Sequence, residues 1–228
     1  MEVIHTWIIG QKLWIILAVG IIYNFYWLYE CRKRLEMNQL TILTISVIHT
    51  IVGVFLVKIF AFFESGFDME SVGKMSIYGA TFLMPVFYLL LAKYTGKNIS
   101  DIFDIFTICM LFTLMCSRWN CILSGCCLGK TITENTSLRW PTRELEIIYY
   151  FVLIYVLKKK IFKKENRGTL YPIYMISYGI FRFIIECFRE ADSNFIFHKA
   201  HIWSLISICV GLIIYWKQKR TKHIKQLR

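Results

Sequence analysis

Long apolar segments follow one another along almost the whole chain, with short charged stretches between them. Seven segments approach the length that a helix needs to cross a hydrocarbon layer about 30 Å thick: residues 7–29, 41–63, 76–94, 102–117, 145–157, 169–187 and 202–216. The pattern predicts an all-α, polytopic membrane helix bundle of about seven transmembrane helices. Because these segments leave no room for a separate soluble domain, we expect one integral membrane domain over residues 1–228.

Two of the segments are marginal as membrane spans. Asp104 interrupts the fourth segment, and the fifth is short. Six spans and one half-buried segment therefore remain an alternative.

The net charge of +12 is distributed according to the predicted topology. Residues 32–34, 93–97, 158–168 and 217–228 together carry 17 basic residues, against 7 in the connections that alternate with them. The positive-inside rule then predicts an external N-terminus and a cytoplasmic C-terminus, with residues 118–143 and 189–201 outside. We interpret the basic tail as an orientation signal that contacts anionic lipids, and we expect no nucleic acid among the partners.

The sixth segment carries charged residues inside its apolar sequence, YGIFRFIIECFRE. A turn of about 100° per residue puts Tyr178, Arg182, Glu186 and Arg189 on one stripe of a helix. Charges in contact with lipid are costly, so the stripe should face a protein interior, a partner charge or a polar ligand. We interpret it as a functional site. The alternative is an Arg182–Glu186 pair that only holds two helices together.

Arginines are frequent on the predicted external side, where the candidates are Arg118, Arg139, Arg143, Arg182 and Arg189. Their guanidinium groups match the geometry of phosphate. Gly125 and Gly129 permit close backbone approach or unusual turns nearby. A phosphate-bearing lipid is therefore the expected ligand. Ordinary extension of arginines from helix ends toward the interface is the alternative; it explains Arg139 and Arg143 well and Arg182 poorly.

Three of the eight cysteines cluster in the predicted external loop NCILSGCCLG, as Cys121, Cys126 and Cys127. Thiols on an external face can oxidise, so a disulfide from Cys121 to Cys126 or Cys127 remains open. The sequence predicts no metal site, because no second Cys or His pair follows at zinc spacing. The other cysteines lie in or beside apolar segments, where Cys behaves as a small hydrophobic residue.

Several of these motifs resemble those of the bacterial prolipoprotein diacylglyceryl transferases. YGIFRFIIECFREAD is similar to the family's Y-G-x-x-R-F-x-x-E-x-x-R-x-x-D helix. RWPTRELE is similar to its H-P-x-x-x-Y-E segment, with Trp140 and Leu145 in place of His and Tyr. SRWNCILSGCCLG resembles its signature G-R-x-G-N-F-x-N-x-E-x-x-G through Arg118 and Gly129, and KMSIYGA resembles a segment ending in His-Gly-Gly, with Tyr78 replacing His.

The resemblance covers roughly the C-terminal two-thirds of the chain and implies a seven-span transferase of lipoprotein biosynthesis. Such an enzyme lies in the bacterial inner or plasma membrane. It moves diacylglycerol from phosphatidylglycerol, or another anionic phospholipid, to the cysteine thiol of an acceptor protein or peptide. Glycerol phosphate is released. The resemblance implies neither a metal nor a soluble cofactor.

The resemblance also implies roles for particular residues. Arg118, Arg182 and Arg189 would hold the phosphate as it becomes the leaving group. Glu186 would orient Arg182, and Glu146 or Tyr78 would help to deprotonate the incoming thiol. The implied catalytic set is Arg118, Glu146, Arg182, Glu186 and Tyr78. The implied substrate-binding set is Arg143, Arg189, Tyr178, Gly125 and Gly129.

The chain departs from the family signature in its cysteine-rich loop. Cys121, Ser124 and Cys126 stand where the family carries Asn, Asn and Glu, so an altered acceptor is a second interpretation. A non-catalytic lipid-binding protein or transporter would use the ion pair without chemistry. A thiol-disulfide oxidoreductase would use the clustered cysteines, but the chain lacks a C-x-x-C motif and the charged stripe would stay unexplained.

Overall fold

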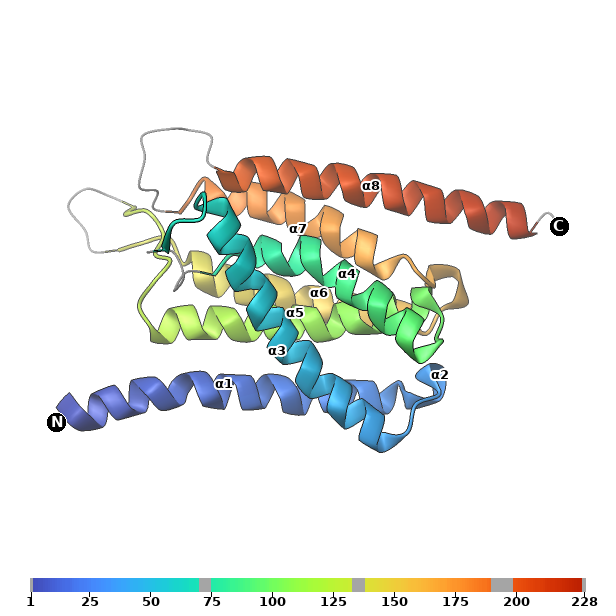
Figure 1. Ribbon diagram of the computed structural model, residues 1–228. Coiled ribbons are helices and arrows are strands. Elements are labelled where there is room, and N and C mark those ends of the chain that lie inside the picture. The colour runs from blue at the N-terminus through green and yellow to red at the C-terminus, as the bar shows by residue number, and fades with distance from the viewer. Residues whose placement is uncertain (1, 70–74, 133–137, 190–198, 227–228) are drawn as a thin grey trace. The chain divides into compact units, whose positions relative to one another are not determined.

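The computed structural model describes residues 2–69, 75–132, 138–189 and 199–226, and this part of the chain is almost entirely helical (Figure 1). Its helices are α1 (Glu2–Glu30), α2 (Arg32–Leu35), α3 (Gln39–Glu64), α4 (Ile77–Thr95), α5 (Ile99–Leu123), α6 (Thr142–Ile161), α7 (Leu170–Glu186) and α8 (Lys199–Gln226), with a short 3-10 helix η2 (Lys164–Asn166) before α7. Within these ranges, extended pairing is limited to two isolated bridges. The all-α prediction is confirmed.

Each of the seven predicted segments coincides with a helix. The fourth segment belongs to α5, which runs through Asp104 without interruption. The Asp104 side chain is fully buried, and its carboxylate lies 3.5 Å from the Arg34 guanidinium. This opposite charge offsets part of the cost of burying the carboxylate.

Among the described residues, four helices are long and apolar enough to cross a membrane by length and composition: α3, α4, α5 and residues Lys199–Thr221 of α8. The apolar part of α1, Trp14–Glu30, is shorter. Large apolar side chains project from these helices and from α6; Phe55, Phe151 and Trp216, for example, are 61%, 67% and 74% exposed. These features agree with a multi-pass membrane protein, while the number of spans and the orientation of the termini stay predictions.

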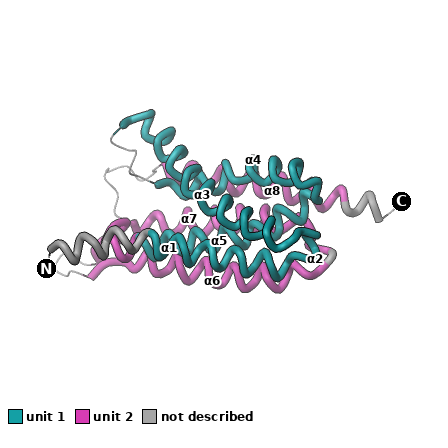
Figure 2. The backbone as a smooth tube through the Cα atoms, turned by 60° about the horizontal axis from the view of Figure 1, so that its bottom comes forward, with its two compact units in different colours: residues 1–120 teal, residues 121–228 magenta. Residues whose placement is uncertain are grey.

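The Cα positions divide the chain into two compact units, residues 1–120 and residues 121–228 (Figure 2). We call them unit 1 and unit 2. The single integral membrane domain stays a prediction.

Unit 1 contains a buried network of polar side chains that includes no Asp, Glu, Lys or Arg. The Asn24 amide donates a hydrogen bond to the Thr50 hydroxyl over 3.1 Å and lies 3.4 Å from His49 Nδ1. His49 Nε2 lies 3.2 Å from the Tyr88 hydroxyl, which in turn donates to the Phe106 carbonyl over 3.2 Å. These contacts join α1, α3, α4 and α5, and we call them the Asn–His–Tyr network.

Unit 2 is organised around α7 and α8, which lie side by side (Figure 1). A Cβ atom added to Gly179 would lie 2.7 Å from Ile208 Cγ1 and 2.8 Å from the Ser204 carbonyl oxygen. One added to Gly211 would lie 2.9 Å from Ile176 Cγ1. The two glycines therefore let the helix backbones approach closely, as small residues do in membrane helix pairs.

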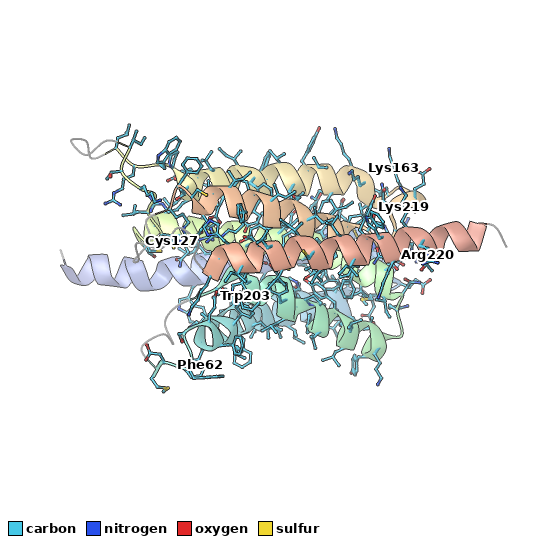
Figure 3. All side chains as sticks on the ribbon, turned by 90° about the horizontal axis from the view of Figure 1, so that it is seen from above. Phe62, Cys127, Lys163, Trp203, Lys219 and Arg220 are labelled. Atoms are coloured by element: carbon cyan, nitrogen blue, oxygen red, sulfur yellow. The ribbon has the colours of Figure 1, made fainter. Side chains whose placement is uncertain are left out.

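The two ends of unit 2 differ in character. Figure 3 shows Cys127 near the beginning of α8, whereas Lys163, Lys219 and Arg220 lie toward its other end. Basic residues of α8 and of the connection after α6 thus lie at the end opposite the cysteine-rich loop.

Candidate functional site

Arg182 is the centre of a buried group of charges in unit 2. Its side chain is 7% exposed, and Nη1 donates to Glu146 Oε1 of α6 over 2.8 Å. Nη2 lies 2.7 Å from Glu186 Oε2, one turn further along α7. Arg189 Nη1 lies 3.9 Å from the same carboxylate oxygen. We call these four residues the Arg–Glu cluster; its two positive and two negative formal charges balance.

The structure corrects one part of the predicted stripe. Tyr178, Arg182 and Glu186 belong to α7, but the helix ends at Glu186, so Arg189 lies beyond it. The backbone there pairs with the preceding loop: Lys130 N donates to the Phe188 carbonyl over 2.9 Å, and Gly129 and Arg189 form an antiparallel bridge. The turn that follows the helix, in which Arg189 N donates to the Glu186 carbonyl over 3.2 Å, and this pairing together position Arg189 beside Glu186.

The loop that pairs with Arg189 depends on a glycine. A Cβ atom at Gly129 would collide with the carbonyl oxygen of Trp140. Trp140 N donates to the Lys130 carbonyl over 3.0 Å, and the Trp140 ring lies 4.7 Å from the Phe188 ring. Gly129 therefore permits the close backbone approach that holds this loop against the end of α7.

Aromatic rings of α6 and α7 pack beside the Arg–Glu cluster, one turn before Arg182. Tyr178 is fully buried one turn before Arg182, and its ring stacks 6.0 Å from Tyr150 and 5.6 Å from Tyr174. The neighbouring Tyr149 hydroxyl and Ser177 hydroxyl are 2.5 Å apart. These packed rings exclude water, and charged interactions are stronger where water is excluded.

The cysteine-rich loop begins at the C-terminal end of α5 and is fastened to α6. Arg143 Nη1 donates to the carbonyl oxygens of Cys121 and Cys126, over 3.4 and 3.3 Å. All eight cysteines lie in the described part of the chain, and none is in a disulfide. Gly125 has a φ of +66°, so the unusual turn occurs at this glycine.

The pKa of Cys126 is raised above the ordinary thiol value, first by partial burial and second by neighbouring Cys127. A raised pKa reduces the thiolate fraction at neutral pH. Since the thiolate is the attacking species in thiol-disulfide exchange, this speaks against the oxidoreductase alternative.

A contact between a cysteine and a histidine was not anticipated from the sequence. His201 of α8 is buried, with Nε2 3.8 Å from the Cys187 sulfur and its ring edge-on to Phe183 at 4.9 Å. Cys187 is exposed, and its interpretation as a small hydrophobic residue stays a prediction. The only local signal was the polar beginning of the last apolar segment, KAHIWSL.

The structure brings some of the predicted site residues together, and two others belong to unit 1. Glu146, Arg182, Glu186 and Arg189 form one cluster, with Gly129 bridged to Arg189. Arg118 of α5 and Tyr78 of α4 are both buried but belong to unit 1. Their participation in a common site with the Arg–Glu cluster stays a prediction.

Long apolar helices and an internal cluster of charges are together typical of a multi-pass membrane protein with a polar internal site. Residues 13–217 match the family model described as prolipoprotein diacylglyceryl transferase. The chain belongs to this family. The match also includes the N-terminal third, for which the motifs indicated no resemblance.

Individual relatives carry the name phosphatidylglycerol--prolipoprotein diacylglyceryl transferase. The protein from Clostridium tetani is 22% identical over 87% of this chain and 89% of its own length. That from Finegoldia magna is 23% identical, with 90% of each chain covered. A shorter match, to the protein from Buchnera aphidicola subsp. Schizaphis graminum, is 36% identical over 30% of this chain and 26% of the relative.

Proposed function

We propose that this protein transfers the diacylglyceryl group of phosphatidylglycerol to the cysteine thiol of a prolipoprotein in a bacterial inner or plasma membrane. Family membership supports the reaction. The observation that carries the site is Arg182, buried between two carboxylates from α6 and α7. A cluster of this kind offers both a cation for a phosphate and a carboxylate for a proton.

In the proposed reaction, the acceptor sulfur attacks the carbon of the diacylglyceryl group that carries the phosphate ester. The new S–C bond forms, the C–O bond to phosphate breaks, and glycerol phosphate leaves with the electron pair. Arg182 and Arg189 stabilise the negative charge that develops on the leaving group. Each terminal nitrogen of Arg182 carries two N–H groups, so a phosphate oxygen can be bound beside the carboxylates.

The thiol must lose its proton in this reaction, and Glu146 is our proposed acceptor. Its carboxylate already accepts a hydrogen bond from Arg182. When Glu146 takes up the thiol proton it becomes neutral, so its attraction for Arg182 decreases. Transfer of the thiol proton to Glu146 therefore leaves the Arg182 guanidinium more available to the departing phosphate, so the two events are coupled.

The other predicted site residues take supporting roles in this proposal. Arg118 adds a third cation for the phosphate, and Tyr78 assists removal of the thiol proton. Arg143 and Gly125 shape the entrance loop, while Gly129 keeps the loop against Arg189. Tyr178 seals the site on its helical side.

A second candidate acceptor is compatible with the same reaction. Cys121, Ser124 and Cys126 replace two amides and a carboxylate of the family signature, which changes the groups that an acceptor peptide meets. An acceptor with a thiol outside the usual lipoprotein signal would fit this loop.

The reaction is tested with purified protein in detergent, phosphatidylglycerol labelled in its acyl chains, and cysteine-containing prolipoprotein peptides. We expect label on the peptide and one glycerol phosphate released per peptide modified. Peptides with Ser in place of Cys serve as the control. Phosphatidylglycerol that binds without turnover would support the non-catalytic alternative. A panel of thiol peptides with altered signals distinguishes the usual acceptor from an altered one.

A further inference from the structure

Two of the clustered thiols are held together by the way α5 ends. Cys126 N donates to the Cys121 carbonyl over 3.1 Å, and Gly125 N donates to the Ile122 carbonyl over 3.2 Å. With Gly125 at φ +66°, these are the two hydrogen bonds of a Schellman motif. The motif sets the first and the sixth of its residues against each other, here Cys121 and Cys126.

The third thiol is brought in by an unusual backbone conformation. Cys127 has a φ of +58°, in the left-handed region that residues with a Cβ atom rarely adopt. Such a conformation persists only where its surroundings require it, and it is frequent at ligand-binding sites. Here it turns the Cys127 side chain back, so that the sulfur atoms of Cys121, Cys126 and Cys127 all lie within 4.8 Å of one another.

This spacing is close to that of three sulfurs around one metal ion. With Zn–S bonds of about 2.3 Å, two thiolates at the tetrahedral angle are about 3.8 Å apart. Rotation of χ1 by about 30°, within one rotamer well, moves a sulfur by roughly 0.9 Å. The side chains can therefore close on a metal without a change of the backbone.

One positively charged side chain lies beside the cluster. Arg143 donates to the carbonyl oxygens of both Cys121 and Cys126, which brings a guanidinium group to the backbone of the cluster. Three thiolates around a monovalent or divalent cation leave net negative charge, and a nearby guanidinium offsets it. A disulfide, in contrast, would use two of the sulfurs and give the third no role.

We propose that Cys121, Cys126 and Cys127 form a three-thiolate site for a soft metal ion, Zn²⁺ or Cu⁺. Thiolate ligands select these ions over hard cations such as Mg²⁺ and Ca²⁺. The sequence spacing predicted no metal because it lacks a second pair of ligands, and it does not encode the turn at Cys127. Metal binding can be tested independently of the proposed transferase reaction, although Cys121 and Cys126 also belong to the loop that an acceptor peptide would meet. Its effect is to fasten the loop at the end of α5.

Metal binding is measured on the purified full chain in detergent, reduced, stripped with a chelator and then loaded with Zn²⁺ or, without oxygen, with Cu⁺. We expect one equivalent of one of these ions to be retained after desalting, and the separate loadings identify which. Cd²⁺ in place of Zn²⁺ should give a sulfur-to-metal charge-transfer band. Loading to the same extent in the triple Ser variant of the three cysteines would overturn the proposal.

Single replacements by Ser at each of the three cysteines should weaken binding by more than the roughly 10- to 100-fold that loss of an outer-shell partner costs. The matched control is Cys209→Ser, which removes an exposed cysteine of α8 outside the cluster. Equal weakening in the control would contradict the assignment.

Gly125→Ala tests the geometry while all three thiols are kept. Nothing lies within 4 Å of an added Cβ at this position, so the change acts only through the left-handed backbone. Binding should weaken roughly 5- to 30-fold, the factor that corresponds to the cost of this conformation in a residue with a Cβ. Unchanged affinity would show that the Schellman motif does not build the site.

Thiol labelling keeps the proposal testable if the variants fold poorly. In the wild-type protein, three fewer thiols should react with a maleimide after metal loading, and a chelator should restore all three. Protection of two thiols that a reductant reverses and a chelator does not would identify a disulfide instead, and would overturn the metal site.

Discussion

The Asn–His–Tyr network of unit 1 and the Arg–Glu cluster of unit 2 are both buried polar groups between helices, but they differ in charge. In unit 1 the contacts run from the Asn24 amide through His49 to Tyr88 and end on a backbone carbonyl. In unit 2 four formal charges converge around Arg182. Unit 1 also holds two buried carboxylates, Asp101 and Asp104, but their partner Arg34 is 25% exposed, whereas Arg182 is 7% exposed. Burying charges is costly, so the enclosed arginine of unit 2 is the one that we propose serves a ligand.

Replacement of Arg182 should produce the largest effect on turnover, because we propose that this residue binds the phosphate of the substrate. Arg182→Lys keeps the charge but loses the planar fork, and Arg182→Ala loses both. We expect turnover of phosphatidylglycerol to fall on the order of ten-fold or more per lost contact worth ~1.5 to 3 kcal/mol. Turnover is measured beside thermal stability in detergent. An active Arg182→Gln, Glu186→Gln double variant would make the cluster a structural ion pair like the contacts of unit 1.

Gly129→Ala tests whether the loop beside Arg189 belongs to the charged site. The added Cβ collides with the Trp140 carbonyl, so the loop must move away from the end of α7. Overpacking of this kind costs about 1–3 kcal/mol, and we expect reduced turnover with a moderately lower melting temperature. Gly53→Ala is the matched control, because open space surrounds its added Cβ. Wild-type turnover in Gly129→Ala would separate the loop from the site.

Asn24→Leu tests the other side of the comparison. It removes the amide from the Thr50 and His49 contacts and leaves their polar groups to be satisfied elsewhere. We expect a loss of about 1–3 kcal/mol in stability, with turnover per folded molecule unchanged. Thermal unfolding and an assay corrected for the folded fraction measure the two quantities. A fall in turnover larger than the fall in folded protein would give the Asn–His–Tyr network a part in function.

Arg34→Gln should have the smallest effect on turnover. Arg34 is charged like Arg182, with Nη2 2.6 Å from Asp101 and 3.5 Å from Asp104, and its own side chain is 25% exposed. Because the change removes this partner from two buried carboxylates, we expect a loss of stability of up to about 3–5 kcal/mol, as for a broken buried ion pair, and no change in turnover per folded molecule. A drop in turnover as large as that of Arg182→Ala would mean that charge alone, without the burial and partners of unit 2, determines the result.

The helices and the central arginine were predictable from the sequence because both depend on local periodicity. A stretch of apolar residues specifies a helix, and four-residue spacing places Glu186 one turn from Arg182. The contact between Arg182 and Glu146 was not predictable in this way, since it joins residues 36 positions apart on two helices. Arg189 was assigned to the helical stripe, because nothing in the local pattern indicates the bridge with Gly129. The same limit applies to His201 and Cys187.

The glycine contacts between α7 and α8 have a consequence for biosynthesis. α7 leaves the ribosome before its partner, carrying Arg182 and Glu186, and its Gly179 face stays uncovered until Gly211 and Ser204 have been made. Helices in a bilayer associate after each has formed, so docking of α8 is the last step that covers this face. A nascent chain interrupted between the two helices would present that face to lipid and to the quality-control proteases of the membrane. The interval between synthesis of α7 and of α8 is therefore a stage at which this glycine face has no partner helix.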